Sequence, residues 1–313
     1  MDPSYVAAMI DAFQQARVVN YAHVSALAIM IYDIFTTLDL EMTHIWAARW
    51  SPPKVLYLIA RYYALFHLSL VLAVDVTLGV NLNLTLYANH SERTLALTSI
   101  RCNGFFRING FGLQLLADIA DALLIMRLRC MYNNSKRVTL VLGALFVIQA
   151  IIQAVVIGFS TSNSGAVEPP PGLSAQWPGC FYTSLPPRYD IVAWLTSLLF
   201  AIILFAMTLH KLWQFRCGGM KAGGLFVIFA QDGVMFFATI FVLELLNTVV
   251  TWVVTISDGR LLGIGVPWTV ACYGIVSSRL VLNVREYGAE MQQLSLPSRS
   301  KTTAESQHIR EAV

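Results

Sequence analysis

Among the carboxylates inside apolar stretches of this chain, where ionisable side chains are costly, three are candidates for chemistry. Asp118 and Asp121 are three residues apart, so a helix presents them on one face. Two carboxylates this close cannot both ionise cheaply in lipid. The arrangement suits general-acid catalysis, proton transfer or cation binding. The alternative is a polar lining of a helix bundle, packed against the amide side chains of Gln149, Gln153 or Asn247.

The third carboxylate, Glu244, lies near the middle of its apolar stretch. Asn247, Thr248 and Thr251 follow it at roughly helical spacing. Because it is the deepest carboxylate of the chain, Glu244 is the best single candidate for a functional group. The catalytic residues, if there are any, are therefore to be sought among Asp118, Asp121 and Glu244.

Asp33 and Arg61 are predicted to form an ion pair within the membrane. They lie in the first two apolar stretches, which a short loop joins, so the two helices are antiparallel neighbours. At about 1.5 Å per residue, each side chain lies roughly 10 Å inside the same boundary. We expect the pair to be structural, and the alternative is a lock that opens when the protein switches.

Several mechanisms lack the residues that they require. No lysine lies inside any of the apolar stretches, so no amine is available for a retinal Schiff base. The chain has no His-Glu-x-x-His, Cys-x-x-Cys, Gly-x-Ser-x-Gly or phosphate-loop motif. Its six histidines are scattered. We therefore expect no metal site and no cofactor.

The composition identifies lipid as the solvent for most of the chain. Of 313 residues, 57% are hydrophobic and only 12% are charged, against about 25% in an ordinary soluble domain. The mean hydropathy is +0.62. A net charge of +3 is too mild to indicate a polyanionic partner. These values exclude a soluble globular enzyme, a disordered chain and a nucleic-acid binder.

Seven stretches are long and apolar enough to cross about 30 Å of hydrocarbon as helices. The predicted fold class is therefore all-α, a polytopic bundle of seven transmembrane helices. The second stretch is the weakest, since it contains Arg61, His67 and Asp75, and a six-span alternative omits it. The stretches are 18–40, 55–80, 108–126, 138–159, 191–209, 234–256 and 262–282.

Charge asymmetry predicts that the N-terminus lies outside and the C-terminus in the cytoplasm. In this orientation the cytoplasmic segments hold 13 Lys and Arg residues against 6 in the outer segments, as the positive-inside rule requires. Asn83 and Asn89 begin glycosylation sequons in a loop that is then outside. A third sequon, at Asn133, is cytoplasmic and should stay unmodified.

The cysteine positions agree with this orientation. Cys102 precedes the third stretch and Cys180 lies in the long loop before the fifth, both outside, where disulfides persist. We predict a Cys102–Cys180 bridge, with two free thiols as the alternative. Cys130, Cys217 and Cys272 should be reduced. The expected organisation is an outer segment (1–17), a membrane domain (18–284) and a disordered cytoplasmic tail (285–313).

The first two stretches also carry a recognisable signature. The elements that carry the resemblance are Tyr32-Asp33, Thr37-Leu38, Glu41, Ile45-Trp46, Trp50-Ser51, Lys54 and Arg61-Tyr62. They resemble the N-terminal domain of a large family of fungal membrane proteins, mainly from basidiomycetes, whose function is unknown. Later segments, Leu128–Tyr132, Asp232-Gly233 and Ser277–Glu286, also fit. The resemblance implies a seven-span fold in the plasma membrane or an endomembrane, and it implies no activity.

Two classes of function remain. Receptor-like architecture is favoured by the outside N-terminus, the predicted bridge and the basic cytoplasmic loops. Its partners would be the bilayer, a small lipophilic ligand and a cytoplasmic signalling protein. The G-protein-coupled receptor motifs are nevertheless missing from Met126–Arg129, from the sixth stretch and from the end of the seventh. The alternative is a membrane-embedded enzyme that protonates a terpenoid or lipid substrate through the intramembrane carboxylates. An accessory or transport role is a further alternative.

Overall fold

The computed structural model describes residues 3–77, 91–163, 166–167, 181–182, 190–217, 224–256 and 263–295. These residues are almost entirely helical, which confirms the all-α class; the exception is one two-residue antiparallel pair of strands. The elements are α1 (Pro3–Glu41), the π-helical turn η1 (Met42–Trp46), α2 (Pro52–Leu58), the π-helical turn η2 (Ile59–Tyr63), α3 (Ala64–Thr77), α4 (Ser91–Met131), α5 (Lys136–Asn163), β1 (Ala166–Val167), β2 (Phe181–Tyr182), α6 (Asp190–Cys217), α7 (Gly224–Ile256) and α8 (Val266–Ser295).

Within the residues that the structure describes, five helical segments are long and apolar enough to cross a membrane. The protein is therefore a multi-pass integral membrane protein, as its composition predicts. The segments are Arg17–Trp46, Pro52–Val74, Lys136–Ser162, Asp190–Gln214 and Gly233–Val253. The remaining long helices, α4 and α8, carry more ionisable side chains and fall outside this set.

Several helices extend beyond the predicted stretches. Helix α1 begins at Pro3, so most of the expected outer segment (1–17) is continuous with the first stretch. Helix α8 continues to Ser295, past the expected domain end at 284. The predicted limits follow the ends of the apolar runs, whereas a helix continues through polar residues because its backbone hydrogen bonds do not depend on lipid.

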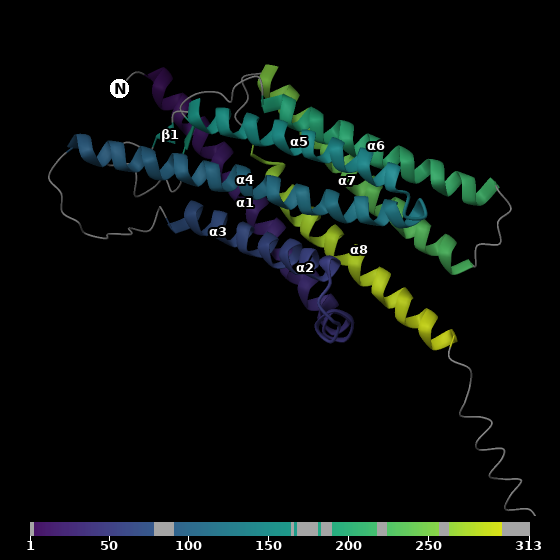
Figure 1. Cartoon of the computed structure of the whole chain (residues 1–313). Coiled ribbons are helices and arrows are strands. Elements are labelled where there is room, and N and C mark those ends of the chain that lie inside the picture. The colour runs from purple at the N-terminus through teal and green to yellow at the C-terminus, as the bar shows by residue number, and fades with distance from the viewer. Residues whose placement is uncertain are drawn as a thin grey trace, which may run out of the picture.

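The helices lie side by side along one direction (Figure 1). Helix α1 packs against α3, and each helix from α3 to α7 packs against the one that follows it along the chain. Helix α8 packs against α1, α3, α4 and α7. The last helix of the chain therefore closes the bundle against both its first and its second half. The N-terminus and the start of α4 lie at one end of the bundle, and the last turns of α8 lie at the other (Figure 1).

Two connections at that second end, η1–α2 and α4–α5, lie wholly within the described residues and are short. Pro52 and Pro53 occupy the first turn of α2, where the missing N–H groups leave no hydrogen bond unmade. Between α4 and α5, Asn133 and Asn134 both have positive φ, at 52° and 55°. Asparagine tolerates this left-handed conformation better than most residues, and the Asn134 amide donates to the Arg129 carbonyl at 2.9 Å.

Glycine permits a close contact of α8 with α1 and α3. A methyl group built on Gly274 would lie 2.7 Å from Cβ of Ala64 in α3 and 3.0 Å from Cε of Met30 in α1. The Ala64 Cβ cannot rotate away, so α8 could only move outward. Small residues at such crossings let membrane helices approach closely, and the contact supplies the packing energy that lipid does not.

Gly274→Ala should therefore destabilise the protein by about 1–3 kcal/mol through overpacking. Gly143 in α5 is the matched control, because no atom lies within 4 Å of the place that a methyl group on it would take. Gly143→Ala should be neutral or stabilising, since alanine restricts the unfolded chain. The free energy of unfolding in mixed micelles measures both variants. Equal effects would show that the α8 contact is not close.

Candidate functional site

Arg61 is fully buried in the turn η2 and contacts two carboxylates of α1. Its Nη1 lies 3.3 Å from Oδ2 of Asp33, and its Nε lies 3.0 Å from Oε2 of Glu41. Both carboxylates are also buried, and they are two helical turns apart on one face of α1. The structure thus brings the predicted pair together and adds Glu41 as a second anion.

The remaining contacts of the guanidinium join a third helix to this pair. Nη2 donates to Oγ1 of Thr37 at 2.5 Å, and Nη1 donates to Oγ of Ser278 in α8 at 3.2 Å. Arg279 of α8 lies 2.7 Å from the other oxygen of Asp33. We call these six residues (Asp33, Thr37, Glu41, Arg61, Ser278 and Arg279) the Arg61 cluster. It contains two cations and two anions, so the formal charge cancels.

Neutral donors complete the surroundings of Glu41. The Trp46 indole N–H and the Tyr62 hydroxyl both donate to its Oε1, at 3.1 Å and 2.7 Å. A buried ion pair is tolerated in a protein only when further hydrogen bonds satisfy its oxygens and N–H groups. The π-helical turns η1 and η2 flank this region, and such turns within helices are frequent at functional sites.

Two further cations hold the helix ends beside the cluster. Lys54 is buried, and its ammonium donates to the carbonyls of Trp46 and Ala48, at 3.2 Å and 2.7 Å. Arg285 of α8 donates to the carbonyl of His44 at 2.8 Å. The last carbonyls of a helix have no partner within it and carry partial negative charge, so both contacts stabilise the end of η1.

The predicted carboxylates are split between two surroundings. Asp121 accepts a hydrogen bond of 3.0 Å from Gln149, which is one of the amides expected to pack there. Glu244 accepts a hydrogen bond from the Tyr273 hydroxyl of α8. Asp121 and Glu244 are close enough to interact electrostatically, and so are Asp121 and Asp118. Asn247 instead donates to Thr269 at 2.7 Å, and Gln153 donates to the carbonyl of Ala193 at 3.4 Å.

A cavity of about 200 Å³ lies between α4, α5, α6, α7 and α8. It occupies the end of the bundle where α5 and α7 finish and α6 and α8 begin, opposite to the Arg61 cluster. Glu244 is the one predicted carboxylate that lines it; Asp118 and Asp121 do not. Its other polar lining comes from Asn109, Gln114, Gln153, Ser160, Thr161, Asp190, Ser197, Thr251, Thr269 and Tyr273.

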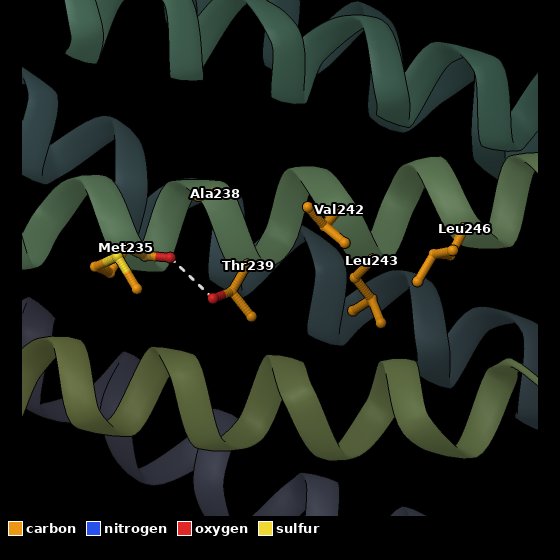
Figure 2. Close-up of a pocket in the computed structure, with 6 residues that line it drawn as sticks. All are labelled: Met235, Ala238, Thr239, Val242, Leu243 and Leu246. Atoms are coloured by element: carbon orange, nitrogen blue, oxygen red, sulfur yellow. Dashed lines mark hydrogen bonds between the residues drawn. The ribbon is translucent and has the colours of Figure 1, made fainter.

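Figure 2 shows a second hollow, on the outer face of α7. It measures about 340 Å³ and is lined by Met235, Ala238, Thr239, Val242, Leu243 and Leu246. Its single hydroxyl, on Thr239, donates to the Met235 carbonyl at 2.8 Å. The hollow offers no free polar group, and exposed apolar side chains of this kind are expected where a helix meets lipid.

Some predicted sites fall outside the structural description. Asn83, Asn89 and Cys180 lie outside the described residues, as does the side chain of Cys102. The disulfide and the two glycans therefore stay predictions. Cys130, Cys217 and Cys272 are free thiols. Within the described ranges, no group of three His, Cys, Asp or Glu side chains is placed to hold a metal ion.

Of this cluster the sequence predicts only Asp33 and Arg61. Sequence reasoning missed the charged members Glu41 and Arg279 as well as Thr37 and Ser278. A signal for Glu41 is present, because Asp33, Thr37 and Glu41 repeat at intervals of four residues and so share a face of α1. The sequence gives no comparable signal for Arg279, because Arg279 and Asp33 are far apart along the chain and no spacing pattern relates them.

Comparison with known proteins gives a match over residues 21–66 to the model of a family of unknown function, DUF6533. No curated protein matches the chain. The matched segment runs from the second half of α1 into the start of α3. It therefore contains Asp33, Thr37, Glu41, Lys54 and Arg61, and the region similar to that family is the helical hairpin that holds the arginine.

Arg61→Met should destabilise the protein by about 3–5 kcal/mol, because it leaves buried anions without their shared cation. Arg279→Met is the matched control. Its side chain is 49% exposed, so its loss should cost about 0–1 kcal/mol. Unfolding in mixed micelles compares the two. Equal losses, or an unchanged Arg61→Met variant, would contradict the role assigned to Arg61.

Proposed function

We propose that this protein is a seven-span membrane protein of receptor-like architecture, with its N-terminus outside and its C-terminus in the cytoplasm. The cavity in its outer half takes up a small ligand. Ligand binding then moves helix α8, and this movement alters the Arg61 cluster and the cytoplasmic end. The proposal rests on three features: the number of crossings, the orientation, and the path of α8 between the two polar sites.

Packing supports two crossings beyond the five apolar segments. Helix α4 packs against α5, and a connection of a few residues joins them, so α4 must run back along an apolar span. At about 1.5 Å per residue, its 41 residues extend roughly 60 Å, which exceeds the membrane core. Asp121 and Arg127 of α4 are buried, as expected for ionisable groups that face a bundle interior. Helix α8 packs among α1, α3, α4 and α7 in the same way.

The position of α8 is the observation that carries the receptor-like proposal. Tyr273 lines the cavity and donates to Glu244, whereas Ser278 and Arg279 belong to the Arg61 cluster. Five residues of helix, about 7.5 Å, separate Tyr273 from Ser278. A ligand that displaces Tyr273 would therefore move a rigid helix whose next turns hold the cluster together. Coupling of this kind requires an element that both sites bias.

The cytoplasmic end has a second contact that such a movement would alter. Arg127 of α4 is buried and lies 6.0 Å from the ring centroid of Phe236 in α7. A methyl group on Gly233 of α7 would lie 2.6 Å from this guanidinium. The Arg127 side chain of α4 therefore reaches α7 on the side where the proposal puts a cytoplasmic partner.

A membrane-embedded enzyme is the second candidate, because Glu244 and Tyr273 form a buried carboxylate–phenol pair on the wall of a cavity. Such a pair could deliver a proton to a lipophilic terpenoid or lipid substrate. Glu244→Gln separates the candidates. An enzyme would lose turnover entirely, whereas a receptor would keep its output with a shifted affinity for its ligand.

The proposed orientation predicts that Asn83 and Asn89 are glycosylated and that Asn133 is not. Expression in cells that glycosylate secreted proteins, followed by glycosidase treatment, should reveal two removable glycans. Asn83→Gln and Asn89→Gln should each remove one, and Asn133→Gln should change nothing. A glycan on Asn133 would place the α4–α5 connection outside and reverse the proposed orientation.

The proposed coupling predicts that filling the cavity changes the cytoplasmic end. Cys130 and Cys217 are exposed thiols at the ends of α4 and α6, so spin labels on them report the distance between these helices. The background is Cys272→Ser, and mass spectrometry confirms two labels per chain. Ser197→Phe, which fills the cavity, should shift the distance distribution by about 2 Å or more.

Leu199→Phe is the control, because Leu199 lies on the same helix but is 59% exposed on its outer face. This variant should leave the distance unchanged. Identical distributions for a folded Ser197→Phe variant and the parent would contradict coupling between the two ends.

A further inference from the structure

We propose that the cavity between α4 and α8 binds a small organic ammonium ion, with Glu244 as its counter-charge. This inference rests on the proposed function and names its ligand class. Three features of the cavity favour such a ligand: the incomplete hydrogen bonding of Glu244, the negative charge of the lining, and the size and aromatic character of the walls.

Glu244 is a carboxylate whose hydrogen bonding is incomplete. It is buried inside the helix bundle, 1% exposed, in the middle of the apolar helix α7. Its Oε1 accepts a hydrogen bond from the Tyr273 hydroxyl, and the Ser197 hydroxyl is a second hydrogen-bonding neighbour of the carboxylate. Its Oε2 has no hydrogen-bond partner among the described residues. A buried carboxylate oxygen without a partner is strongly unfavourable, and Glu244 lines the cavity. A donor brought by a ligand would supply the missing partner.

The charges around the cavity favour a cation. Asp190 also lines it; its Oδ2 accepts Ser160 at 3.0 Å, and its Oδ1 makes no hydrogen bond within the described part of the chain. Asp121 does not line the cavity, but it is close enough to Glu244 to interact with it electrostatically. No Lys, Arg or His occurs among the described lining residues. An anionic ligand would therefore meet carboxylates and no compensating cation.

Asp190 has a structural role that Glu244 lacks. It is the first residue of α6, where an acidic side chain stabilises the helix by facing its positive end. Glu244 stands in mid-helix, with no such reason for its charge. Glu244 is therefore the principal counter-charge, and Asp190 contributes at the outer edge of the cavity.

The walls suit an organic cation better than a bare metal ion. Phe106, Trp194 and Tyr273 contribute aromatic rings, and Leu113 and Val266 are among the aliphatic side chains. Aromatic faces attract ammonium groups, whereas a hard metal cation needs six or more oxygen ligands. At about 200 Å³, the cavity is smaller than the 300–1,000 Å³ typical of drug-sized ligands. A short alkylamine or arylalkylamine has the matching size.

The test is ligand-induced thermal stabilisation of the full chain in lipid nanodiscs. The probes are methyl-, butyl-, 2-phenylethyl- and trimethylphenylammonium chloride at constant ionic strength, and 2-phenylethanol and butanol serve as neutral analogues. At least one ammonium ion should raise the melting temperature saturably, as a ligand that binds only the folded state does. Its neutral analogue should not.

Glu244→Gln should weaken the binding of that ion about 30-fold or more, because a desolvated charge would lose its partner. Glu244→Asp keeps the charge and should bind more tightly than Glu244→Gln. Asp39→Asn is the matched control, because it also replaces an acid by its amide, but on an exposed residue of α1. This variant should bind the ion as tightly as the parent does. If Glu244→Gln does not fold, Ala193→Phe, which fills the cavity and leaves both carboxylates in place, should abolish binding.

Four results would overturn the inference: no saturable stabilisation by any ammonium ion, equal stabilisation by the alcohols, unchanged binding to folded Glu244→Gln, or the same effect from Na⁺ alone. The spin-label experiment fails separately. Ammonium binding with an unmoved cytoplasmic end would keep this ligand class and reject the receptor-like function. Movement of the cytoplasmic end without ammonium binding would keep the receptor-like function and reject this ligand class.

Discussion

The buried guanidinium of Arg61 is the constraint on which the rest of the structure depends. A cation in the interior of a membrane bundle is unfavourable unless anions and hydrogen-bond acceptors surround it. The chain provides Asp33 and Glu41 from α1 and Ser278 from α8. Because these groups come from separate helices, the charge is satisfied only when α1, η2 and α8 are in register. One side chain thereby fixes how the first hairpin and the last helix of the bundle meet.

The two ends of the bundle differ in how their charges are balanced. In the Arg61 cluster two cations face two anions, and Asp33 is shared between Arg61 and Arg279. Around the cavity, Glu244 and Asp190 have no cation among the described lining residues. A balanced cluster stabilises the helix contacts, whereas an unbalanced cavity attracts a ligand of the opposite charge. Helix α8 joins the two, with Tyr273 at one and Ser278 at the other.

The sequence is sufficient to predict the helices and the pairing of Asp33 with Arg61. Apolar runs specify where lipid-exposed helices lie, and the equal depth of two opposite charges in adjacent helices brings them together. For Glu41 the sequence offers only the four-residue spacing from Asp33 and Thr37, because Glu41 stands at the edge of its apolar run and so resembles a residue facing water. Ser278 and Arg279 are distant in sequence, and only the packing of α8 against the first hairpin brings Ser278 to Arg61 and Arg279 to Asp33.

The cavity cannot be predicted from the sequence, although Glu244, one of the residues that line it, can be identified as a buried carboxylate. The depth of Glu244 identifies it as a buried carboxylate, but the walls come from five helices whose rotation about their axes the sequence does not define. For the same reason the sequence groups Asp118 and Asp121 with Glu244 as one set of candidates. In the structure Asp121 turns to Gln149, and only Glu244 lines the cavity.

The most direct test of the central claim is a double-mutant cycle between Arg61 and Glu41, with unfolding free energy as the readout. Arg61→Met leaves an excess anion, and Glu41→Gln leaves an excess cation while keeping an acceptor for Trp46 and Tyr62. The double variant restores neutrality through Asp33 and Arg279. We predict that it is less destabilised than the sum of the single variants by at least about 1 kcal/mol. Additivity within about 0.5 kcal/mol would contradict the claim that charge balance holds these helices together.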